Sequence, residues 1–166
     1  MQIAIHQGYK PGLIGQVVLL HAAYYAREYG FGQHFESKVA AGLAEFASRL
    51  VSPRNAIWSV ELDSQIAGSI AIDGEDIGQG VAHLRWFILS DQLRATGVGQ
   101  SLLATALHFC DQSGFDSTQL WTLKGLNAAR HLYEKSGFVL TKEALDCTWG
   151  PVMTEQLFVR PRFMEL

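Results

Sequence analysis

The chain has 166 residues, of which 48% are hydrophobic and 17% are charged, and its formal net charge is -3. This length and apolar content indicate one folded domain, residues 1–166, with a substantial core. The slightly acidic balance excludes the basic surface that nucleic acids and anionic membranes attract, and no apolar run reaches the roughly 18 residues of a membrane span. We therefore expect a cytoplasmic protein without nucleic-acid or membrane partners.

The sequence predicts no metal site and no disulfide framework. It contains two cysteines, Cys110 and Cys147, and none of its six histidines stands at zinc-ligand spacing from either of them. Cys110 falls on the apolar side of a predicted helix, where a small buried thiol is the usual outcome.

The N-terminal third predicts a strand followed by two helices. Residues 1–7 form a short strand, and a helix covers residues 13–28, because apolar side chains recur there at helical spacing. A second apolar stripe runs from Phe35 to Leu50, and Pro53 ends that helix.

Two strands and a polar loop lead to the middle of the chain. Residues 56–61 and 65–73 predict a hairpin that turns at Asp63-Ser64. Residues 74–80 then form a Gly-rich loop that precedes the most apolar strand of the chain, residues 82–89.

A glycine pair connects the strand over 82–89 to a helix over 98–113. Gly97 and Gly99 stand where this helix begins, and Gly114 stands where it should end. The first turn of a helix carries free backbone N–H groups and partial positive charge, and glycines let an anion approach the backbone closely. The spacing therefore predicts a phosphate or pyrophosphate site.

The glycine pair matches neither of two well-known phosphate motifs. No Lys follows the glycines as in a P-loop, and the residues after Gly99 include no third glycine of a dinucleotide fingerprint. A tight turn that lets the helix pack against its strand explains the same residues. Both interpretations stay open.

The remaining elements are a strand over 118–123, a helix over 127–136 and a strand over 138–143. Met153 to Arg160 is a last strand, in which apolar and polar side chains alternate only roughly. The predicted order is β-α-α-β-β-β-α-β-α-β. Strands separated by helices favour parallel pairing, whereas the hairpin adds antiparallel strands. We therefore predict an α/β protein with a mixed sheet and helices on both faces.

Two segments together carry a resemblance to a known family. Arg-x-x-Gly-x-Gly follows a strand at residues 94–99, and Asn127, an alanine pair, Leu132-Tyr133 and Ser136-Gly137-Phe138 follow further on. This combination resembles the GNAT superfamily of acyl-CoA-dependent N-acyltransferases, most strongly over residues 82–143. The resemblance implies that two central parallel strands splay apart and admit acetyl-CoA there.

The segments 24–30 and 154–156 resemble one subgroup of that superfamily. Members of this subgroup are often fused to a MarR-type winged-helix DNA-binding domain. We expect no such domain here, because the acyltransferase-like pattern starts close to Met1 and the chain is acidic.

The resemblance implies where acetyl-CoA binds. The main chain of Phe87, Ile88 and Leu89 would hydrogen-bond the pantetheine arm as an added strand, a role compatible with an ordinary buried strand. The pyrophosphate cradle would comprise Arg94, Ala95, Thr96, Gly97, Val98, Gly99 and Gln100. Ala95 replaces a glycine that is frequent in relatives, but it keeps its N–H donor.

Three residues of the helix over 127–136 are further candidates. Asn127 would approach the pantetheine arm, and it is also a good helix N-cap residue. Arg130 would reach a CoA phosphate or belong to a solvated face. Tyr133 would act as the general acid for the CoA thiolate, and the alternative is a structural tyrosine whose hydroxyl is tied to a neighbour.

Acyl transfer to an amine also needs a neutral nucleophile. An alkyl ammonium has a pKa of about 10.4, so a base or a desolvating site is useful near pH 7. His83 titrates in the useful range and is the candidate base. A packed or surface histidine is the alternative, and an ordered water would serve in its place.

The acceptor amine is expected at the junction of the two N-terminal helices. Tyr24, Tyr25, Glu28 and Tyr29 combine aromatic faces with a carboxylate, which suits a cationic amine. Alternatively the tyrosines cover the core and Glu28 is solvated.

These inferences predict an N-acetyltransferase that moves an acetyl group from acetyl-CoA to a primary amine by direct attack in a ternary complex. The acceptor is either a small molecule or a protein amine, and a homodimer is left open. The alternatives are a catalytically inactive acyl-CoA sensor and a transcription factor, and Tyr133 argues against the sensor because a sensor needs no thiolate acid.

Overall fold

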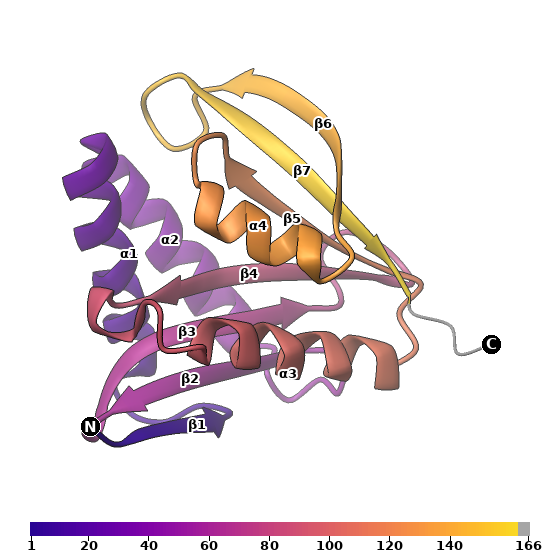
Figure 1. The fold of residues 1–166 in the computed structure, drawn as a ribbon, viewed down its shortest axis with the longest axis horizontal. Coiled ribbons are helices and arrows are strands. Elements are labelled where there is room, and N and C mark those ends of the chain that lie inside the picture. The colour runs from indigo at the N-terminus through magenta and orange to yellow at the C-terminus, as the bar shows by residue number, and fades with distance from the viewer. Residues whose placement is uncertain (163–166) are drawn as a thin grey trace.

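A computed structural model describes residues 1–162 and shows a seven-stranded sheet with the strand order β1-β2-β3-β4-β5-β7-β6 (Figure 1). Its elements are β1 (Ile3–Gln7), α1 (Leu13–Tyr29), α2 (Gln33–Ala47), β2 (Ala56–Leu62), β3 (Gln65–Asp73), β4 (Val81–Leu89), α3 (Val98–Gln112), β5 (Ser117–Leu123), α4 (Asn127–Lys135), β6 (Val139–Asp146) and β7 (Met153–Pro161).

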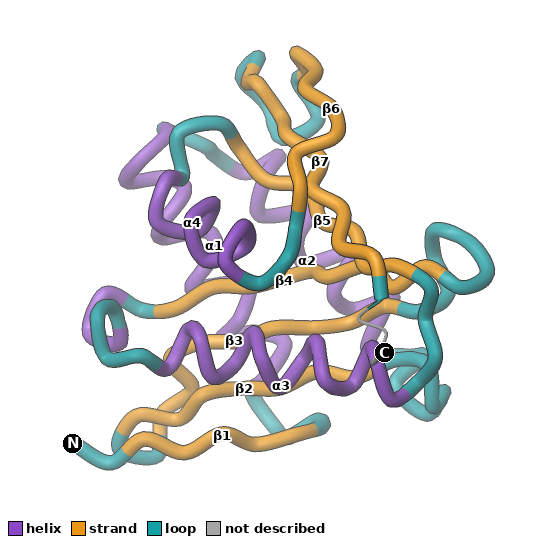
Figure 2. The backbone as a smooth tube through the Cα atoms, turned by 45° about the vertical axis from the view of Figure 1, so that its right-hand side comes forward, coloured by secondary structure: helices purple, strands orange, loops and turns teal. Residues whose placement is uncertain are grey.

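Helices cover both faces of the sheet, as predicted. Helices α1 and α2 lie on one face, and α3 and α4 lie on the other (Figure 2). The larger core lies on the α3 side and contains Leu102, Leu103, Phe158 and the buried thiol of Cys110, whose burial was also predicted. None of the helices in the described range combines the length and apolar character needed to cross a bilayer.

The mixed α/β fold is confirmed, with two differences in detail. The predicted order left out the last strand, although residues 153–160 were predicted to form one; the structure has it as β7, which pairs between β5 and β6. Helix α2 ends at Ala47 rather than at Pro53, because the main chain tightens there: Arg49 N–H and Leu50 N–H bond to carbonyls three residues back. A short 3₁₀ turn over Asp91–Leu93, absent from the prediction, precedes the glycine pair.

Strands β4 and β5 separate soon after they meet, which positions the site. They pair in parallel only through Val81–His83 and Ser117–Gln119, and β5 then turns toward β7 (Figure 1). The rest of β4 stays paired with β3 alone. Within residues 1–162, its other backbone edge therefore has no strand beside it from Leu84 to Leu89.

A bulge in β4 marks the middle of this free edge. Trp86 has φ 48°, which is unusual for a bulky residue, and the register with β3 shifts between Ser69 and Ala71. The buried hydroxyl of Ser69 donates a hydrogen bond to the Trp86 carbonyl at 2.7 Å. This bond satisfies a main-chain group that the bulge removes from the ladder.

Candidate active site

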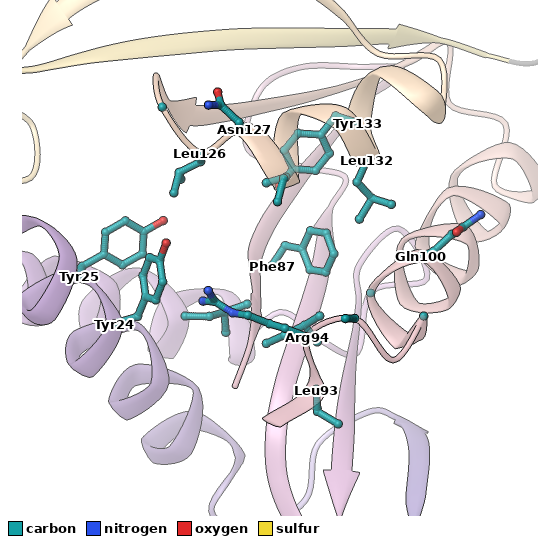
Figure 3. A pocket seen from close by; sticks show the side chains of 18 residues that line it. Tyr24, Tyr25, Phe87, Leu93, Arg94, Gln100, Leu126, Asn127, Leu132 and Tyr133 are labelled. Atoms are coloured by element: carbon teal, nitrogen blue, oxygen red, sulfur yellow. The ribbon is translucent and has the colours of Figure 1, made fainter. Parts of the chain in front are cut away.

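A cleft of about 690 Å³ opens where β4 and β5 separate, and its walls come from β4, the turn after it, and the starts of α3 and α4 (Figure 3). Helix α1 closes the far end. Twelve of the predicted site residues line it: Tyr24, Tyr25, Phe87, Ile88, Leu89, Arg94, Ala95, Gly97, Gly99, Gln100, Asn127 and Tyr133. Its lining in the described chain contains no carboxylate and no imidazole.

The start of α3 faces the cleft, where the sequence predicts an anion site. Gly97 is the N-cap with φ 83°, and the first turn of the helix carries no acidic residue. A Cβ built on Gly97 meets no atom within 4 Å, so the space in front of the turn is open. Free N–H groups and the helix dipole therefore point into an open space that suits a phosphate.

Gly99 fits the second interpretation of the glycine pair, a tight turn that lets the helix pack against its strand. A Cβ on Gly99 would lie 2.9 Å from Cδ1 of Leu89, so this glycine lets α3 pack closely against β4. The two interpretations left open by the sequence thus apply to different glycines. Gly97 keeps the anion space open, and Gly99 keeps the helix against its strand.

Ala95 adopts a backbone conformation that normally belongs to glycine. Its φ is 59°, in the left-handed region that costs an L-residue roughly 1–2 kcal/mol. The glycine expected from relatives would relieve this strain. The turn keeps its shape because Thr96 Oγ1 donates to the Leu93 carbonyl at 2.5 Å.

Tyr133 lines the cleft and is 6% exposed, with Phe87, Phe138 and Phe158 around its ring. Within residues 1–162 its hydroxyl makes no hydrogen bond, so the alternative of a tied structural tyrosine finds no partner here. Burial, and to a lesser degree the nearby Tyr25, raises the pKa of the Tyr133 hydroxyl above its usual range. The hydroxyl therefore stays protonated and able to donate.

Six residues of the lining were missed by sequence reasoning. Gly125 and Leu126 come from the turn between β5 and α4, and Leu93 comes from the turn after β4. The other three, Ala128, Ala129 and Leu132, lie on α4. A signal was available, because the carboxyl ends of parallel strands meet at one edge of a sheet and ligands bind there. The turn after β5 must therefore lie beside the turn after β4.

Asn127 does not cap its helix. Leu126 occupies the N-cap position, no side chain caps the helix, and Asn127 is its first residue. Asn127 lines the cleft and its side chain makes no hydrogen bond within residues 1–162, but its amide is directed away from Phe87 and Arg94 (Figure 3). The N-cap interpretation is therefore wrong, and the amide remains free for a ligand.

Three predicted cofactor residues lie outside the lining. The Val98 side chain is buried in the core, and its N–H donates to Thr96 Oγ1 at 3.4 Å. Thr96 thus closes the turn rather than facing the cleft. Arg130 pairs with Glu134 on α4, and its guanidinium lies 5.7 Å from the centre of the Phe158 ring.

His83 also lies away from the cleft, in an ion-pair network on the α2 side. Its Nδ1 is 2.8 Å from the Asp76 carboxylate, and Arg85 reaches both Asp76 and the fully buried Asp73 at 3.4 Å. Burial alone would raise the pKa of Asp73. Asp73 also accepts hydrogen bonds from Arg49 and the backbone, and it lies close to the charges of the arginines. These interactions outweigh the effect of burial and lower the pKa of Asp73. The network holds α2 against the sheet.

The predicted acceptor residues divide into two pairs. Tyr24 and Tyr25 line the cleft from α1, whereas Glu28 is exposed and pairs with Arg27 at 3.1 Å, and Tyr29 packs on Tyr25 outside the lining. The Tyr24 ring lies 5.1 Å from the Arg94 guanidinium. Aromatic faces thus reach the cleft, but the carboxylate expected beside them does not.

Comparison with known proteins identifies relatives of this chain. A family model described as Acetyltransferase (GNAT) family matches residues 25–138. A curated relative, named "Probable N-acetyltransferase camello" from Xenopus tropicalis, is 26% identical over 133 residues, which cover 78% of this chain. The chain spans about 60% of the length of that relative.

Solved structures share the fold at low sequence identity. YncA of Salmonella typhimurium, solved with its cofactor acetyl-CoA, has a TM-score of 0.78 at 11% identity, over 100% of this chain and 97% of that one. The PaiA N-acetyltransferase of Thermoplasma acidophilum, in complex with coenzyme A, has a TM-score of 0.74 at 15% identity, over 97% of this chain and 99% of that one. These solved structures show a shared fold only. The family model matches well over half of the chain, and it shows that this protein belongs to the GNAT family of acetyltransferases.

Proposed function

We propose that this protein transfers an acetyl group from acetyl-CoA to a primary amine by direct attack in a ternary complex. One observation carries the proposal: the free edge of β4 runs between the open anion site at Gly97 and the unpaired hydroxyl of Tyr133. A cleft with a phosphate site at one end and a proton donor on its wall suits a long thioester. Acetyl-CoA complexes of fold relatives such as YncA support the choice of cofactor.

The residues of the cleft fit the parts of acetyl-CoA. Backbone groups of Phe87, Ile88 and Leu89 lie on the free edge of β4 and would hydrogen-bond an extended pantetheine arm as a neighbouring strand does. The N–H groups at the start of α3 would hold the pyrophosphate, with Arg94 at its rim. When bound, the cofactor supplies an acetyl group activated as a thioester.

Tyr133 would donate its proton to the departing sulfur. Because burial raises the pKa of its hydroxyl, the group is fully protonated near neutral pH and stabilises a thiolate by a hydrogen bond. The apolar rings of Phe87 and Phe158 exclude water around it, which strengthens that bond.

The acceptor amine would lose its proton to water. About one alkyl ammonium in 10³ is neutral at pH 7, and the described lining of the cleft offers no carboxylate or imidazole base. His83, the base predicted from the sequence, pairs with Asp76 away from the lining. Most of the acceleration would then come from holding both reactants in one cleft, an effect that reaches about 7–11 kcal/mol.

A binding and turnover experiment tests this function. The purified protein is first titrated with acetyl-CoA, and we expect 1:1 binding that raises the melting temperature. Free thiol release is then measured with a panel of primary amines, from amino acids to polyamines and lysine peptides. Amine-dependent release supports the proposal, whereas tight binding without release by any amine would favour the inactive sensor.

A further inference from the structure

The lining of the cleft carries a positive charge. Arg94 is the one charged residue among the described residues that line it. A purely cationic amine, such as a polyamine or a lysine side chain, would therefore meet a like charge in the cleft and no counter-charge. An acceptor that also carries a carboxylate would instead meet a guanidinium, which binds a carboxylate through two parallel N–H groups.

The side chain of Arg94 extends toward α1. Its guanidinium lies 5.1 Å from the centre of the Tyr24 ring (Figure 3). Contact with an aromatic face attracts the guanidinium and restricts a side chain that is otherwise flexible. The charge of Arg94 therefore lies against the α1 wall, where the acceptor is expected, although the turn that carries Arg94 also leads to the start of α3.

The guanidinium of Arg94 has donors to spare. Its ion-pair partner Asp91 lies 3.3 Å away, and Arg27 also holds Asp91, at 3.1 Å. Within residues 1–162 the Arg94 side chain makes no hydrogen bond, and it is 51% exposed. Most other arginines in this range donate at least one side-chain hydrogen bond, namely Arg27, Arg49, Arg54, Arg85, Arg130 and Arg160. Arg94 is thus accessible and able to bind a ligand.

Two phenol hydroxyls on the same wall add further donors. Tyr24 and Tyr25 line the cleft from α1, with their ring centroids 5.0 Å apart, and neither hydroxyl makes a hydrogen bond within residues 1–162. Burial, and to a lesser degree the nearby Tyr24 and Tyr29, raises the pKa of the Tyr25 hydroxyl above its usual range, so it stays a donor at neutral pH. A guanidinium and two hydroxyls on one wall suit a carboxylate.

The cleft leaves room for a small acceptor with apolar surface. Its volume is about 690 Å³, and the pantetheine arm along β4 would occupy part of that space. Next to the tyrosines the lining continues in the apolar side chain of Leu126, which packs in the same cluster as Tyr25. A small molecule with an amine, a carboxylate and an apolar side chain matches these features.

We propose that Arg94, together with the hydroxyls of Tyr24 and Tyr25, binds a carboxylate of the acceptor. The acceptor is accordingly an amino acid with an apolar side chain, and polyamines and lysine side chains are disfavoured. The inference rests on the proposed acetyl transfer and names its substrate class. The main chain of Arg94 stays at the rim of the pyrophosphate site, while its side chain selects the acceptor.

Binding of the reaction product tests this role without turnover. The protein is saturated with CoA and titrated calorimetrically with N-acetylphenylalanine and with N-acetylphenylalaninamide, which have nearly the same shape and differ in one charge. We expect wild type to bind the acid roughly tenfold more tightly than the amide, or better. Arg94→Gln should remove this preference, because it removes the charge that the carboxylate pairs with.

Arg130→Gln is the matched control, because Arg130 also places its guanidinium near an aromatic ring, that of Phe158, but stands outside the lining. It should keep the preference for the acid. Equal affinity of wild type for acid and amide, or an Arg94→Gln protein that keeps the preference, would overturn the proposal. A wild type that binds CoA but neither product would overturn it as well, whereas a wild type that binds no CoA would contradict acetyl transfer itself.

Discussion

The two ends of the cleft differ in the part of the protein that lines them, main chain at one end and side chains at the other. At the α3 end the cleft is bordered by main chain: the free edge of β4 and the N–H groups after Gly97. At the α1 end it is bordered by side chains, namely Tyr24 and Tyr25, with an aromatic cluster behind them. A main-chain site tolerates most substitutions but not an added side chain, whereas a side-chain site changes with each residue. One fold can therefore keep its cofactor and change its acceptor.

The largest expected effect follows from adding a side chain at the main-chain end. Gly97→Glu places a carboxylate in the open anion space, so we expect acetyl-CoA binding and activity to be abolished. Gly114→Glu is the matched control, because Gly114 ends the same helix, has φ 78° and also has open space around a Cβ. Calorimetric titration measures both. Normal acetyl-CoA affinity in a folded Gly97→Glu protein would refute the anion site.

The next effect concerns the hydroxyl between the two ends. Tyr133→Phe should lower kcat by about 10²–10⁴-fold if the hydroxyl is the general acid. The KM for acetyl-CoA should change little, since the ring packing on Phe87 and Phe158 remains. Steady-state kinetics with a fixed amine measure both constants. An unchanged kcat together with a lower melting temperature would make Tyr133 structural.

At the side-chain end, Tyr25→Leu should raise the acceptor KM about tenfold, or about 1.4 kcal/mol, because it removes an aromatic face from the cleft wall. Acetyl-CoA binding should stay as in wild type. Glu28→Gln serves as the control, since Glu28 lies outside the lining. If Glu28→Gln shifts the acceptor KM and Tyr25→Leu does not, the acceptor lies on the outer side of α1.

The smallest expected effect concerns Ala95, at the main-chain end of the cleft. Ala95→Gly relieves the left-handed strain at φ 59° and should stabilise the protein by about 1 kcal/mol. Affinity for acetyl-CoA should not change, because the backbone donors are the same in both proteins. Urea unfolding gives the free energy, and a destabilised variant would show that Ala95 contributes by its methyl group instead.

The difference between the two ends of the cleft explains which features could be predicted from the sequence. The elements and the glycine turn follow from local patterns: helical spacing after Gly97, the hairpin at Asp63-Ser64, and the helix stop at Gly114. The cleft residues near Gly97 are close in sequence, so spacing alone indicates an anion site. Thr96, Val98 and Arg130 were misplaced because a local motif does not tell which side of the turn or helix faces the ligand.

The α1 end of the cleft is backed by distant segments. Tyr25, Phe35 and Trp149 pack together because α1, α2 and the β6–β7 hairpin gather around the end of β5. The glutamate closest in sequence to the tyrosines, Glu28, turns to the surface one helical turn away. Similarly, the turn between β3 and β4 brings Asp76 within hydrogen-bond distance of His83, at 2.8 Å. Such long-range contacts leave no periodic signal in the chain.

Following the acetyl group itself tests the central claim most directly. The protein is incubated with acetyl-CoA carrying a deuterated acetyl group and with the most active amine of the panel, and products are followed by mass spectrometry. We predict one deuterated N-acetyl amine for each free thiol released. Thiol released without acetylated amine, or bound acetyl-CoA that persists unchanged beside every amine, would contradict the account.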